Sequence, residues 1–339
     1  ASKEVCRLIN PSVVLVTNVF RDQLDRYGEV THTLENILIG IKNSPNAVIC
    51  LNADCSLTAS IATEIPNKVM FFGVDVPIYN DPVSEVSDAP HCIKCKHEYD
   101  YSYHTFGHLG GFYCPNCGYK RPETQVSVTE ILDTGISSTT VRVSVFGDSE
   151  EIVINLPGGY NIYNAVGALA VSEAIGFKRE TAKSAIATFS CGFGRMEQFD
   201  LGGHTARIIL VKNPAGCNQV LNYLSSLSEK TVFVCCLNDN SADGRDISWI
   251  WDVNFEKLAD MDEFIDEIYV SGIRSADMAV RLKYAGINES KLKIFDDYDS
   301  LIKAMEKQIL PVVIMPTYSA MMDLRSKMSA AFGGKEFWE

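Results

Sequence analysis

Short apolar runs alternate with helical patterns in the first third of the chain. Runs of strand length occupy residues 13–17, 47–51 and 69–74, and between the first two, apolar residues recur at helical spacing from Leu34 to Ile41. Strands that are apolar at consecutive positions are typical of a sheet that is buried on both faces. The pattern therefore predicts an α/β fold with an open, mainly parallel sheet, in which ligands bind at the carboxyl ends of the strands.

The later part of the chain predicts a β-hairpin and then a second α/β domain. Apolar residues alternate with polar ones over 141–145 and again over 152–156, on either side of a Gly-Asp turn, which is typical of a hairpin. The elements expected after the hairpin are helices at about 161–175 and 179–189 and strands at 206–211, 232–237, 267–270 and 312–315 that alternate with helical segments. We therefore predict a first domain over 1–201 and a Rossmann-like second domain over 202–339.

Composition and charge narrow the class of protein. The 339 residues include 30 Lys and Arg against 43 Asp and Glu, a formal net charge of −13, which repels phosphate backbones and argues against nucleic acid as the main partner. The longest apolar runs reach only strand length, so no transmembrane segment is expected. Eleven cysteines, seven of them scattered through apolar strands and loops, suit the reducing cytoplasm better than a disulfide framework.

Four of the cysteines form the strongest motif in the sequence. Cys92 and Cys95 are separated by two residues, as are Cys114 and Cys117, and 18 residues lie between the two pairs. This is the spacing of a four-thiolate zinc site, and a closed shell of four ligands predicts a structural metal that stabilises an insert over 90–121. A redox dithiol and ordinary buried cysteines are the alternatives. Neighbouring histidines could replace a cysteine as ligand, although the spacing favours the thiols: His91, His97, His104 and His108.

The segment after the first predicted strand carries polar residues where a ligand would bind. Asn18, Asp22 and Asp25 could hold a complex of nucleotide and metal at this strand end. Alternatively, the two aspartates only open a helix, because the positive N-terminal end of a helix favours carboxylates. The residues alone leave both interpretations open.

Several segments of the chain resemble the Mur ligase family. The sequence TNVFRDQLDRYGE at 17–29 is similar to the strand-end segment of the family's central domain, and LNAD at 51–54 is similar to a motif farther along it. The sequence GGYNIYNA at 158–165 resembles the family's nucleotide-contacting turn and helix. The sequence GRME at 194–197 resembles the basic motif near the domain junction.

Three further features narrow the resemblance to one branch of the family, the MurT-type subunits of lipid II isoglutaminyl synthase. They are the four-cysteine insert, KNPAG at 212–216 and LNDNSADGRD at 237–246, and the similarity extends over essentially the whole chain. The resemblance implies a Mur-ligase-like central ATP-binding domain with a zinc-ribbon insert. It also implies a C-terminal Rossmann-like domain that contacts a partner subunit.

The resemblance implies a reaction as well as a fold. Members of the branch amidate the α-carboxylate of D-glutamate in the lipid II stem peptide at the inner membrane face, giving D-isoglutamine, and use ATP with Mg²⁺ to form an acyl phosphate. Ammonia comes from a separate glutaminase subunit, a class I glutamine amidotransferase. A Mur or folylpolyglutamate-type ligase that adds an amino acid is the alternative function, and a zinc-ribbon protein that binds nucleic acid is a further one.

Roles for individual residues follow from the same resemblance. Contacts with the nucleotide are implied for Asn18, Asn161, Asn164, Arg195 and Lys212. A catalytic role is implied for Asp246, as the third member of a triad whose cysteine and histidine belong to the glutaminase. From the residues alone, a helix cap before Ser248 is the more frequent role of such an aspartate.

Two features depart from the family pattern. No Gly-x-x-x-x-Gly-Lys-Ser/Thr phosphate loop occurs in the sequence, although the family carries one early in its central domain, so we expect the chain to be truncated upstream of Ala1. Gln23 and Cys55 stand where many amino-acid-adding members have a histidine and an aspartate. A changed metal shell or a changed incoming nucleophile would account for the second departure.

Overall fold

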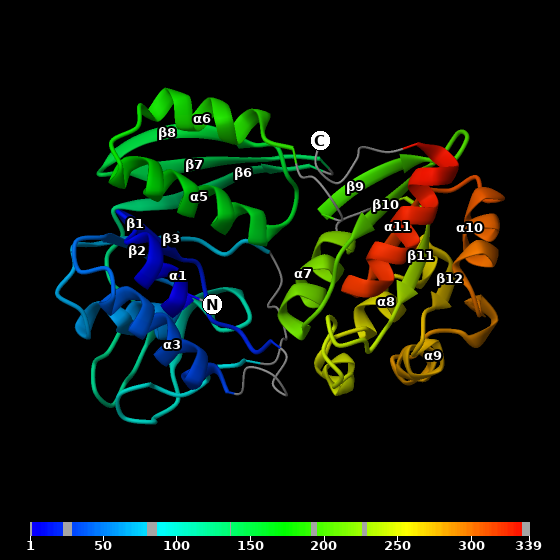
Figure 1. Cartoon of the computed structure of the whole chain (residues 1–339), viewed down its shortest axis with the longest axis horizontal. Helices are drawn as coiled ribbons and strands as arrows, with labels where there is room; N and C mark the ends of the chain where they lie inside the picture. The colour runs from blue at the N-terminus through cyan, green and yellow to red at the C-terminus, as the bar shows by residue number, and fades with distance from the viewer. Residues whose placement is uncertain are drawn as a thin grey trace. The chain divides into compact units, whose positions relative to one another are not determined.

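The computed structural model consists of two compact units (Figure 1). It describes residues 2–22, 29–79, 87–135, 137–190, 195–225 and 229–333. Residues 2–21 and 29–190 belong to the first unit, and Asp22 together with the described residues from 195 onward belongs to the second. Each unit is built around its own six-stranded sheet.

The sheet of the first unit is mixed and has the order β1-β2-β3-β6-β7-β8. Its strands are β1 (Val13–Val16), β2 (Val48–Asn52), β3 (Val69–Val74), β6 (Val126–Thr134), β7 (Thr139–Val145) and β8 (Asp148–Ile154). Strands β1, β2, β3 and β6 run parallel, whereas β6, β7 and β8 pair antiparallel. The three predicted apolar strands and the hairpin are confirmed, while strand β6, in the middle of the sheet, was not predicted.

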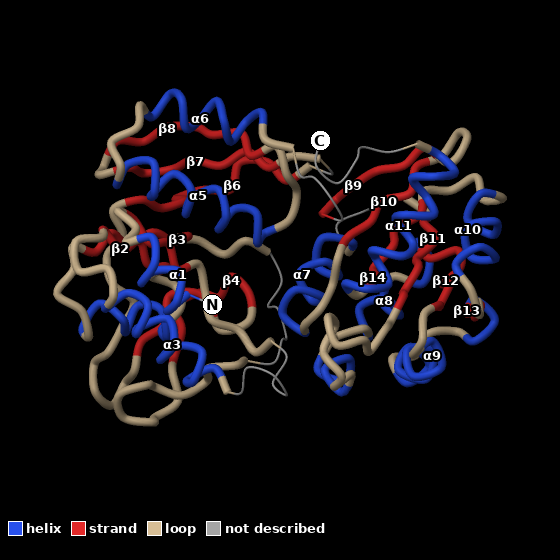
Figure 2. The backbone as a smooth tube through the Cα atoms, in the orientation of Figure 1, coloured by secondary structure: helices blue, strands red, loops and turns tan. Residues whose placement is uncertain are grey.

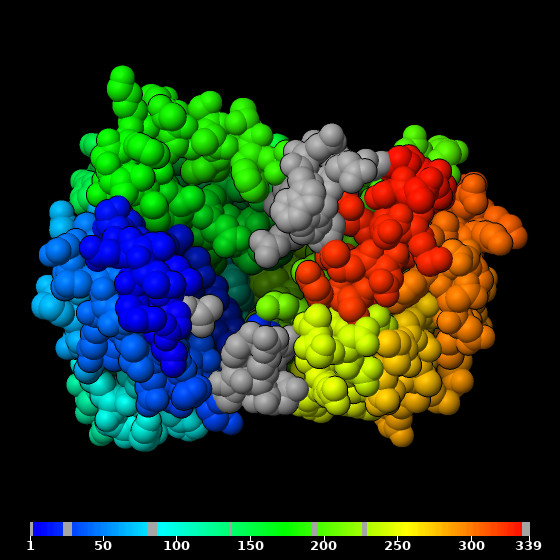
Figure 3. Space-filling model, viewed as in Figure 1, coloured from blue at the N-terminus to red at the C-terminus, as the bar shows by residue number. Residues whose placement is uncertain are grey.

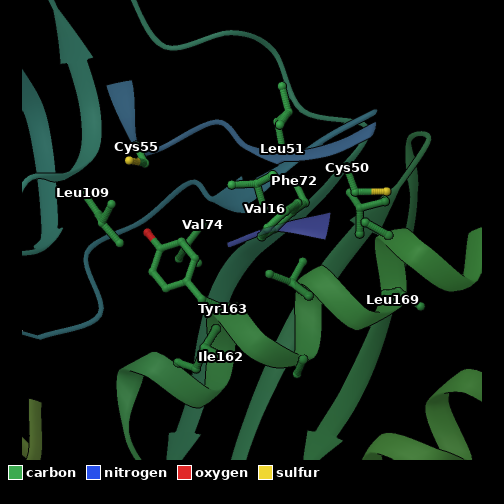
Figure 4. Close-up of a cluster of buried hydrophobic side chains, with 14 of the residues drawn as sticks. Val16, Cys50, Leu51, Cys55, Phe72, Val74, Leu109, Ile162, Tyr163 and Leu169 are labelled. Atoms are coloured by element: carbon green, nitrogen blue, oxygen red, sulfur yellow. The ribbon is translucent and has the colours of Figure 1, made fainter. Parts of the chain in front are cut away.

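Helices cover this sheet, as Figure 2 shows. They are α1 (Ser2–Ile9), α3 (Val30–Lys42), α4 (Ser56–Ser60), η1 (Ile61–Thr63), α5 (Gly159–Ala174) and α6 (Arg179–Thr188). Helix α5 packs closely on the parallel strands. The close approach is clearest at Gly167, where an added Cβ would lie only 3.3 Å from the Phe72 ring. Figure 4 shows buried side chains from α5 and from these strands: Val16, Leu51, Phe72, Ile162 and Leu169.

The predicted insert contains a small antiparallel hairpin, β4 (Asp100–Phe106) and β5 (Leu109–Tyr113). Its aromatic side chains and two cysteines form a small core that also includes Ala59 of α4: Cys92, Tyr99, Phe112 and Cys114. The insert is also joined to the main body, since Leu109 pairs with Cys55 in a backbone bridge. The insert therefore has its own core and a fixed attachment beside the end of β2.

The sheet of the second unit has the order β13-β12-β11-β14-β10-β9. Its strands are β9 (Arg195–Asp200), β10 (Thr205–Ile209), β11 (Thr231–Cys236), β12 (Ile265–Ser271), β13 (Leu292–Ile294) and β14 (Val312–Pro316). Neighbouring strands are parallel except β9, which pairs antiparallel with β10. Every residue of β11 is buried, with Phe233 in one core and Val232 and Val234 in another. Burial on both faces explains the continuous apolar run of this strand.

The helices of the second unit lie between or after its strands. They are α7 (Pro214–Leu224), η2 (Ser248–Asp252), α8 (Glu256–Asp260), η3 (Asp262–Phe264), α9 (Ser275–Tyr284), η4 (Glu289–Lys291), α10 (Tyr298–Glu306) and α11 (Tyr318–Phe332). Helices α7 and α9 supply one core, and α10 and α11 supply the other. The outer side of α11 is exposed at the surface of this unit, in red in Figure 3.

The boundary between the units lies earlier than the predicted residue 201. The described part of the first unit ends at Ser190, and β9 is hydrogen-bonded to β10 in the sheet of the second unit. The Gly202-Gly203 pair, which suggested the boundary, instead forms the turn between these two strands. Both of its amides donate to the Asp200 carboxylate, at 2.9 and 3.0 Å.

Candidate functional site

Polar residues gather at the carboxyl ends of β1, β2 and β3 in the first unit. Asn52, the last residue of β2, is fully buried, and its Nδ2 donates to the backbone oxygen of Thr17 at 2.8 Å. Its Oδ1 accepts from the backbone N–H of Asp54 at 2.9 Å. The LNAD motif therefore ties the end of β1 to the end of β2 and fixes where the Asp54 carboxylate lies.

Asp54 is the centre of a buried charged network. Its Oδ1 lies 2.6 Å from Arg121 Nε, and its Oδ2 accepts from the Tyr163 hydroxyl at 2.5 Å and from the Val74 N–H at 2.8 Å. Arg121 also reaches Asp75 Oδ1 at 2.6 Å. Burial raises the pKa of the Asp54 carboxyl group, and Arg121, Tyr163 and the Val74 amide counteract that rise by stabilising the carboxylate.

The insert supplies much of this network. Arg121 stands at the end of the insert, and the Thr105 hydroxyl in β4 lies 2.8 Å from the Tyr163 hydroxyl. The Tyr103 hydroxyl donates to the backbone oxygen of Val74 at 2.8 Å. The backbone N–H of Gly110 donates to the backbone oxygen of Asp54 at 3.1 Å. The cysteine-bearing insert is therefore bonded to the ends of β2 and β3 and to α5.

A buried cysteine–histidine pair reinforces that attachment. Cys55 Sγ lies 3.4 Å from His108 Nε2, and both side chains are fully buried. Burial alone would raise the pKa of the Cys55 thiol, but the interaction with His108 and backbone hydrogen bonds from Thr58 and Val19 lower it. Cys55, which the resemblance places where many family members have an aspartate, is thus paired with a histidine of the insert. Figure 4 shows Cys55 and the Tyr163 hydroxyl on the side of α5 that faces Leu109.

Two of the residues expected to contact nucleotide lie in the first turns of α5. Asn161 is buried, and its Nδ2 donates to the backbone oxygen of Pro157 at 2.7 Å. Its Oδ1 accepts from Asn164 Nδ2 at 3.3 Å, and Asn164 is exposed. The backbone of Gly158, with φ of 90°, forms the turn into the helix, a conformation that favours glycine. Asn161 therefore holds the turn and orients Asn164, which faces outward.

The other three expected nucleotide contacts are distributed between the two units. Asn18 is half-buried two residues beyond the end of β1. Lys212 follows β10, and its ammonium group lies 2.7 Å from the Asp22 carboxylate. The backbone of Arg195 begins β9, but its side chain lies outside the described residues, as do Gln23 and Asp25.

The four predicted metal ligands lie together. Their sulfur atoms are all within 4.8 Å of one another, with 3.6 Å between Cys92 and Cys117 and 3.4 Å between Cys95 and Cys114. A tetrahedron with metal–sulfur bonds of 2.3 Å requires sulfurs about 3.8 Å apart. A hydrogen bond from the Asn116 side chain and one from the His97 backbone lower the pKa of Cys95 to about 6, which favours the thiolate that a metal needs.

The two Cys-x-x-Cys turns have the same form. The N–H of Lys96 donates to the oxygen of Cys92 at 2.8 Å, and the N–H of Gly118 donates to the oxygen of Cys114 at 3.0 Å. Both residues have positive φ, 65° at Lys96 and 74° at Gly118. The nearby histidines are exposed or, in the case of His108, paired with Cys55. Four thiols, without a histidine, therefore form the candidate metal site.

Asp246 lies in the second unit, in the loop between β11 and η2. It is exposed, and its Oδ1 accepts from the backbone N–H of Ser248 at 2.8 Å. Hydrogen bonds from Ser248 lower the pKa of the Asp246 carboxyl group, so it is ionised at neutral pH. The predicted capping role is therefore met only in part, because Asp246 accepts from the first residue of η2 but Ile247 occupies the N-cap position. The structure also leaves the carboxylate accessible.

The KNPAG motif forms the start of α7. The Asn213 side chain accepts from the Gly216 N–H at 2.8 Å, and Pro214 occupies the first helical position. This is a regular N-cap. The motif that resembled one branch of the family therefore has a local structural role in this chain.

Sequence reasoning missed three residues that complete the first site: Thr105, His108 and Arg121. Each lies more than fifty positions from its partner in the chain, so no local spacing could reveal the contact. In the described part of the chain, no helix is long and apolar enough to cross a membrane.

Comparisons with known proteins agree with this architecture. Residues 210–321 match the family model described as MurT ligase C-terminal. The chain is 33% identical over 328 residues to the MurT subunit of lipid II isoglutaminyl synthase (glutamine-hydrolyzing) from Streptococcus pneumoniae, covering 96% of this chain and 72% of that protein. It is 31% identical over 332 residues to the corresponding subunit of Staphylococcus aureus strain COL, covering 97% and 73%.

Solved structures show the same fold at lower identity. A pseudomurein peptide ligase type C from Methanothermus fervidus matches with a TM-score of 0.70 and 19% identity, covering 97% of this chain and 65% of that one. MurF from Acinetobacter baumannii matches with a TM-score of 0.68 and 16% identity, covering 97% and 62%. The chain thus spans less than two thirds of these two solved chains. The fold is that of the Mur ligases, and the chain belongs to the family of MurT subunits of lipid II isoglutaminyl synthase.

Proposed function

We propose that this chain is the ATP-using subunit of an enzyme that amidates lipid II in peptidoglycan synthesis. The proposed reaction converts the α-carboxylate of D-glutamate in the stem peptide into the amide, giving D-isoglutamine. The observation that carries the proposal is the similarity to MurT subunits over 96% of the chain, in both units. Since the chain spans 72% of that relative, the complete activity is proposed for the full protein.

The chemistry requires activation of a poor electrophile. Transfer of the γ-phosphoryl group of ATP to a carboxylate oxygen gives an acyl phosphate and ADP. Ammonia then attacks the carbonyl carbon, phosphate leaves with the former carboxylate oxygen, and a proton is lost from nitrogen. Catalysis of such a transfer depends on positioning the reactants and on stabilising charge. The buried network around Asp54 keeps the strand ends in fixed positions, as this chemistry requires.

The start of α5 is the proposed site for the nucleotide. Asn164 is exposed there and is oriented by Asn161. A MurF ligase of the same fold, from Thermotoga maritima, has been solved in complex with ADP, which supports a nucleotide as a ligand of this fold. Arg195, Lys212 and Asn18 remain proposed contacts. Mg²⁺ would neutralise charge on the transferred group, and Asn18 offers an amide oxygen of the type that this ion accepts.

Zinc is the metal that we propose for the four cysteines. Sulfur ligands within 4.8 Å of one another suit Zn²⁺, and four thiolates leave no position open for a substrate. The metal would therefore be structural. Its effect would extend beyond the insert, because Arg121 and His108 connect the insert to Asp54 and Cys55.

The proposed partner is a glutaminase subunit of the class I amidotransferase type. The relatives are named as glutamine-hydrolyzing synthases of which MurT is one subunit. Asp246 is exposed and ionised, as required of a carboxylate that orients a histidine of another chain. We place the complex in the cytoplasm, with lipid II presented at the inner membrane face.

The test is amidation by the full-length protein purified together with its glutaminase. Lipid II, ATP and glutamine labelled at the amide nitrogen should give a product that carries the label and has the mass of the amide. Mass spectrometry of the stem peptide measures both. An amino-acid ligase would instead consume ATP with an amino acid and without the partner, and a nucleic-acid binder would bind DNA or RNA with a steep salt dependence. Either result would overturn the proposal.

A further inference from the structure

The loop at 238–246, which carries Asp246, is anchored at its beginning. The backbone N–H of Asn238 donates to Thr317 Oγ1 at 2.9 Å. The side-chain Oδ1 of Asn238 accepts from the N–H of Ile273 at 2.9 Å. Asn238 Nδ2 donates to Ser319 Oγ at 3.0 Å. Asn238 is itself buried. The second residue after β11 is therefore bonded to the segments that follow β12 and β14.

A second anchor lies three residues before Asp246. Asp243 is buried, its Oδ1 accepts from the Ser319 N–H at 2.7 Å, and its Oδ2 accepts from the Ser319 hydroxyl at 2.5 Å. Oδ2 also accepts from the N–H of Asn240 at 3.2 Å. Ser319 is the second residue of α11, so this carboxylate lies at the positive end of a 15-residue helix.

The Ser319 hydroxyl joins the two anchors. It donates to Asp243 and accepts from the side-chain amides of Asn238 and of Asn240, the latter at 2.8 Å. These three contacts use its single donor and both acceptor positions. Gly244 follows with φ of 86°, a value that favours glycine, and two residues later the chain presents Asp246 to solvent.

We propose that Asp243 and Ser319 are positioning residues for the glutaminase reaction: they hold the loop so that Asp246 meets a histidine of the partner. The proposal rests on the proposed function, in which Asp246 completes the partner's triad. A carboxylate orients a histidine only within hydrogen-bond distance, and a displacement of about 1 Å can lower a rate about 100-fold. The anchors are buried, whereas Asp246 is exposed, and they act on it through the loop.

The experiment compares two reactions of the same purified complex. Amidation with glutamine needs both the glutaminase and the ATP-using site, whereas amidation with added ammonium needs only the latter. Ser319→Ala removes the hydroxyl that joins the anchors and keeps the Ser319 N–H. Asp243→Asn keeps one side-chain oxygen that can accept from the Ser319 N–H. It replaces the other oxygen, which accepts from the Ser319 hydroxyl and the Asn240 N–H, with an NH₂ group that donates. We expect both to lower glutamine-dependent amidation by about 10- to 100-fold and to leave ammonium-dependent amidation and complex formation unchanged.

Asp297→Asn is the matched control in the same unit. Asp297 caps α10 by accepting from the Ser300 N–H at 2.7 Å, and it is exposed. It tests whether an Asp-to-Asn change at another N-cap of this unit by itself produces the split between the two reactions, and both reactions should stay normal. If the Asp243 and Ser319 variants lose both reactions in parallel with melting temperature, the residues only stabilise α11 and the proposal is wrong. Normal glutamine-dependent amidation in both variants would also overturn it.

Asp246→Asn, measured alongside, separates failure of this proposal from failure of the proposed function. If Asp246→Asn is defective with glutamine while the Asp243 and Ser319 variants are normal, only the positioning role is refuted. If Asp246→Asn is normal, the shared triad is refuted and the positioning role with it.

Discussion

The carboxyl ends of the two sheets carry polar residues in different states of exposure. In the first unit Asn52 and Asp54 are fully buried, and side chains of the insert complete their network. In the second unit the anchoring carboxylate of Asp243 is buried, but Asp246 is exposed. A closed network fixes geometry within one chain, whereas an exposed carboxylate on an anchored loop is available to another chain. Burial therefore distinguishes the strand ends that organise their own site from the loop that we propose serves a partner.

The largest expected effect comes from breaking the proposed zinc site in the insert that contacts the Asp54 network. Cys114→Ser should abolish stoichiometric zinc and lower the free energy of unfolding by several kcal/mol, because the insert has only a small core of its own. Each kcal/mol corresponds to a fall of about 2–4 °C in the melting temperature for a unit of this size. Elemental analysis and thermal denaturation measure the two effects.

Cys235→Ala is the control for that variant. Cys235 is buried in β11, outside the metal cluster, so its loss should cost packing but leave the zinc content unchanged. Full zinc content in Cys114→Ser, or equal loss of zinc in both variants, would contradict the assignment of the site.

The next effect tests whether the closed network depends on its buried cation. Arg121→Ala leaves the Asp54 carboxylate buried without its counter-ion and should lower the free energy of unfolding by about 3–5 kcal/mol. Arg142→Ala is the matched control, because Arg142 also contacts two carboxylates, those of Glu130 and Glu151, but at the surface. It should cost about 0–1 kcal/mol. Chemical denaturation that gives equal values for the two variants would show that burial does not decide the strength of this network.

A smaller effect is expected from one hydroxyl of the same network. Tyr163→Phe keeps the buried ring but removes the donor to Asp54 Oδ2, which still accepts from the Val74 amide. The expected loss is about 1.5–3 kcal/mol, the range for a hydrogen bond to a charged group. Tyr113→Phe, at an exposed position, should be neutral. Unchanged stability in Tyr163→Phe would remove this link between α5 and the strand ends.

The smallest effect concerns the second unit. Asn213→Ala removes the N-cap of α7 and should cost about 1 kcal/mol with no specific loss of activity. Denaturation and ATP turnover of the complex are measured together. Abolished turnover at unchanged stability would assign the KNPAG motif to chemistry instead of capping.

Local pattern was enough to predict most of the fold and the metal ligands. Continuous apolar runs predicted β1, β2, β3, β11 and β14, and the spacing of two Cys-x-x-Cys pairs predicted four sulfurs that lie together. Strand β6 was missed because it follows a long irregular insert and its alternation of apolar and polar residues breaks at Glu130, after only Val126 and Val128. The boundary was misplaced because a Gly-Gly turn within a hairpin has the composition of a linker.

The network around Asp54 could not be predicted from the sequence. Arg121, Thr105 and His108 meet their partners only because the insert folds back onto the strand ends, and this depends on tertiary packing. Sequence resemblance pointed to Asn161 as a nucleotide contact, which stays a prediction, and did not indicate the bond from its amide nitrogen to the Pro157 backbone oxygen. In the second unit, resemblance indicated Asp246, and only the structure shows what holds its loop.

Asp246→Asn in the complete complex is the most direct test of the difference between the buried network around Asp54 and the exposed Asp246. Asparagine can still accept from the Ser248 N–H, so folding, complex formation and amidation with ammonium should be preserved. Amidation with glutamine should fall about 100-fold or more, because a neutral amide does not stabilise the imidazolium of the partner's histidine. Normal amidation with glutamine would contradict the account, and an equal loss with ammonium would place the defect in the ATP-using half instead.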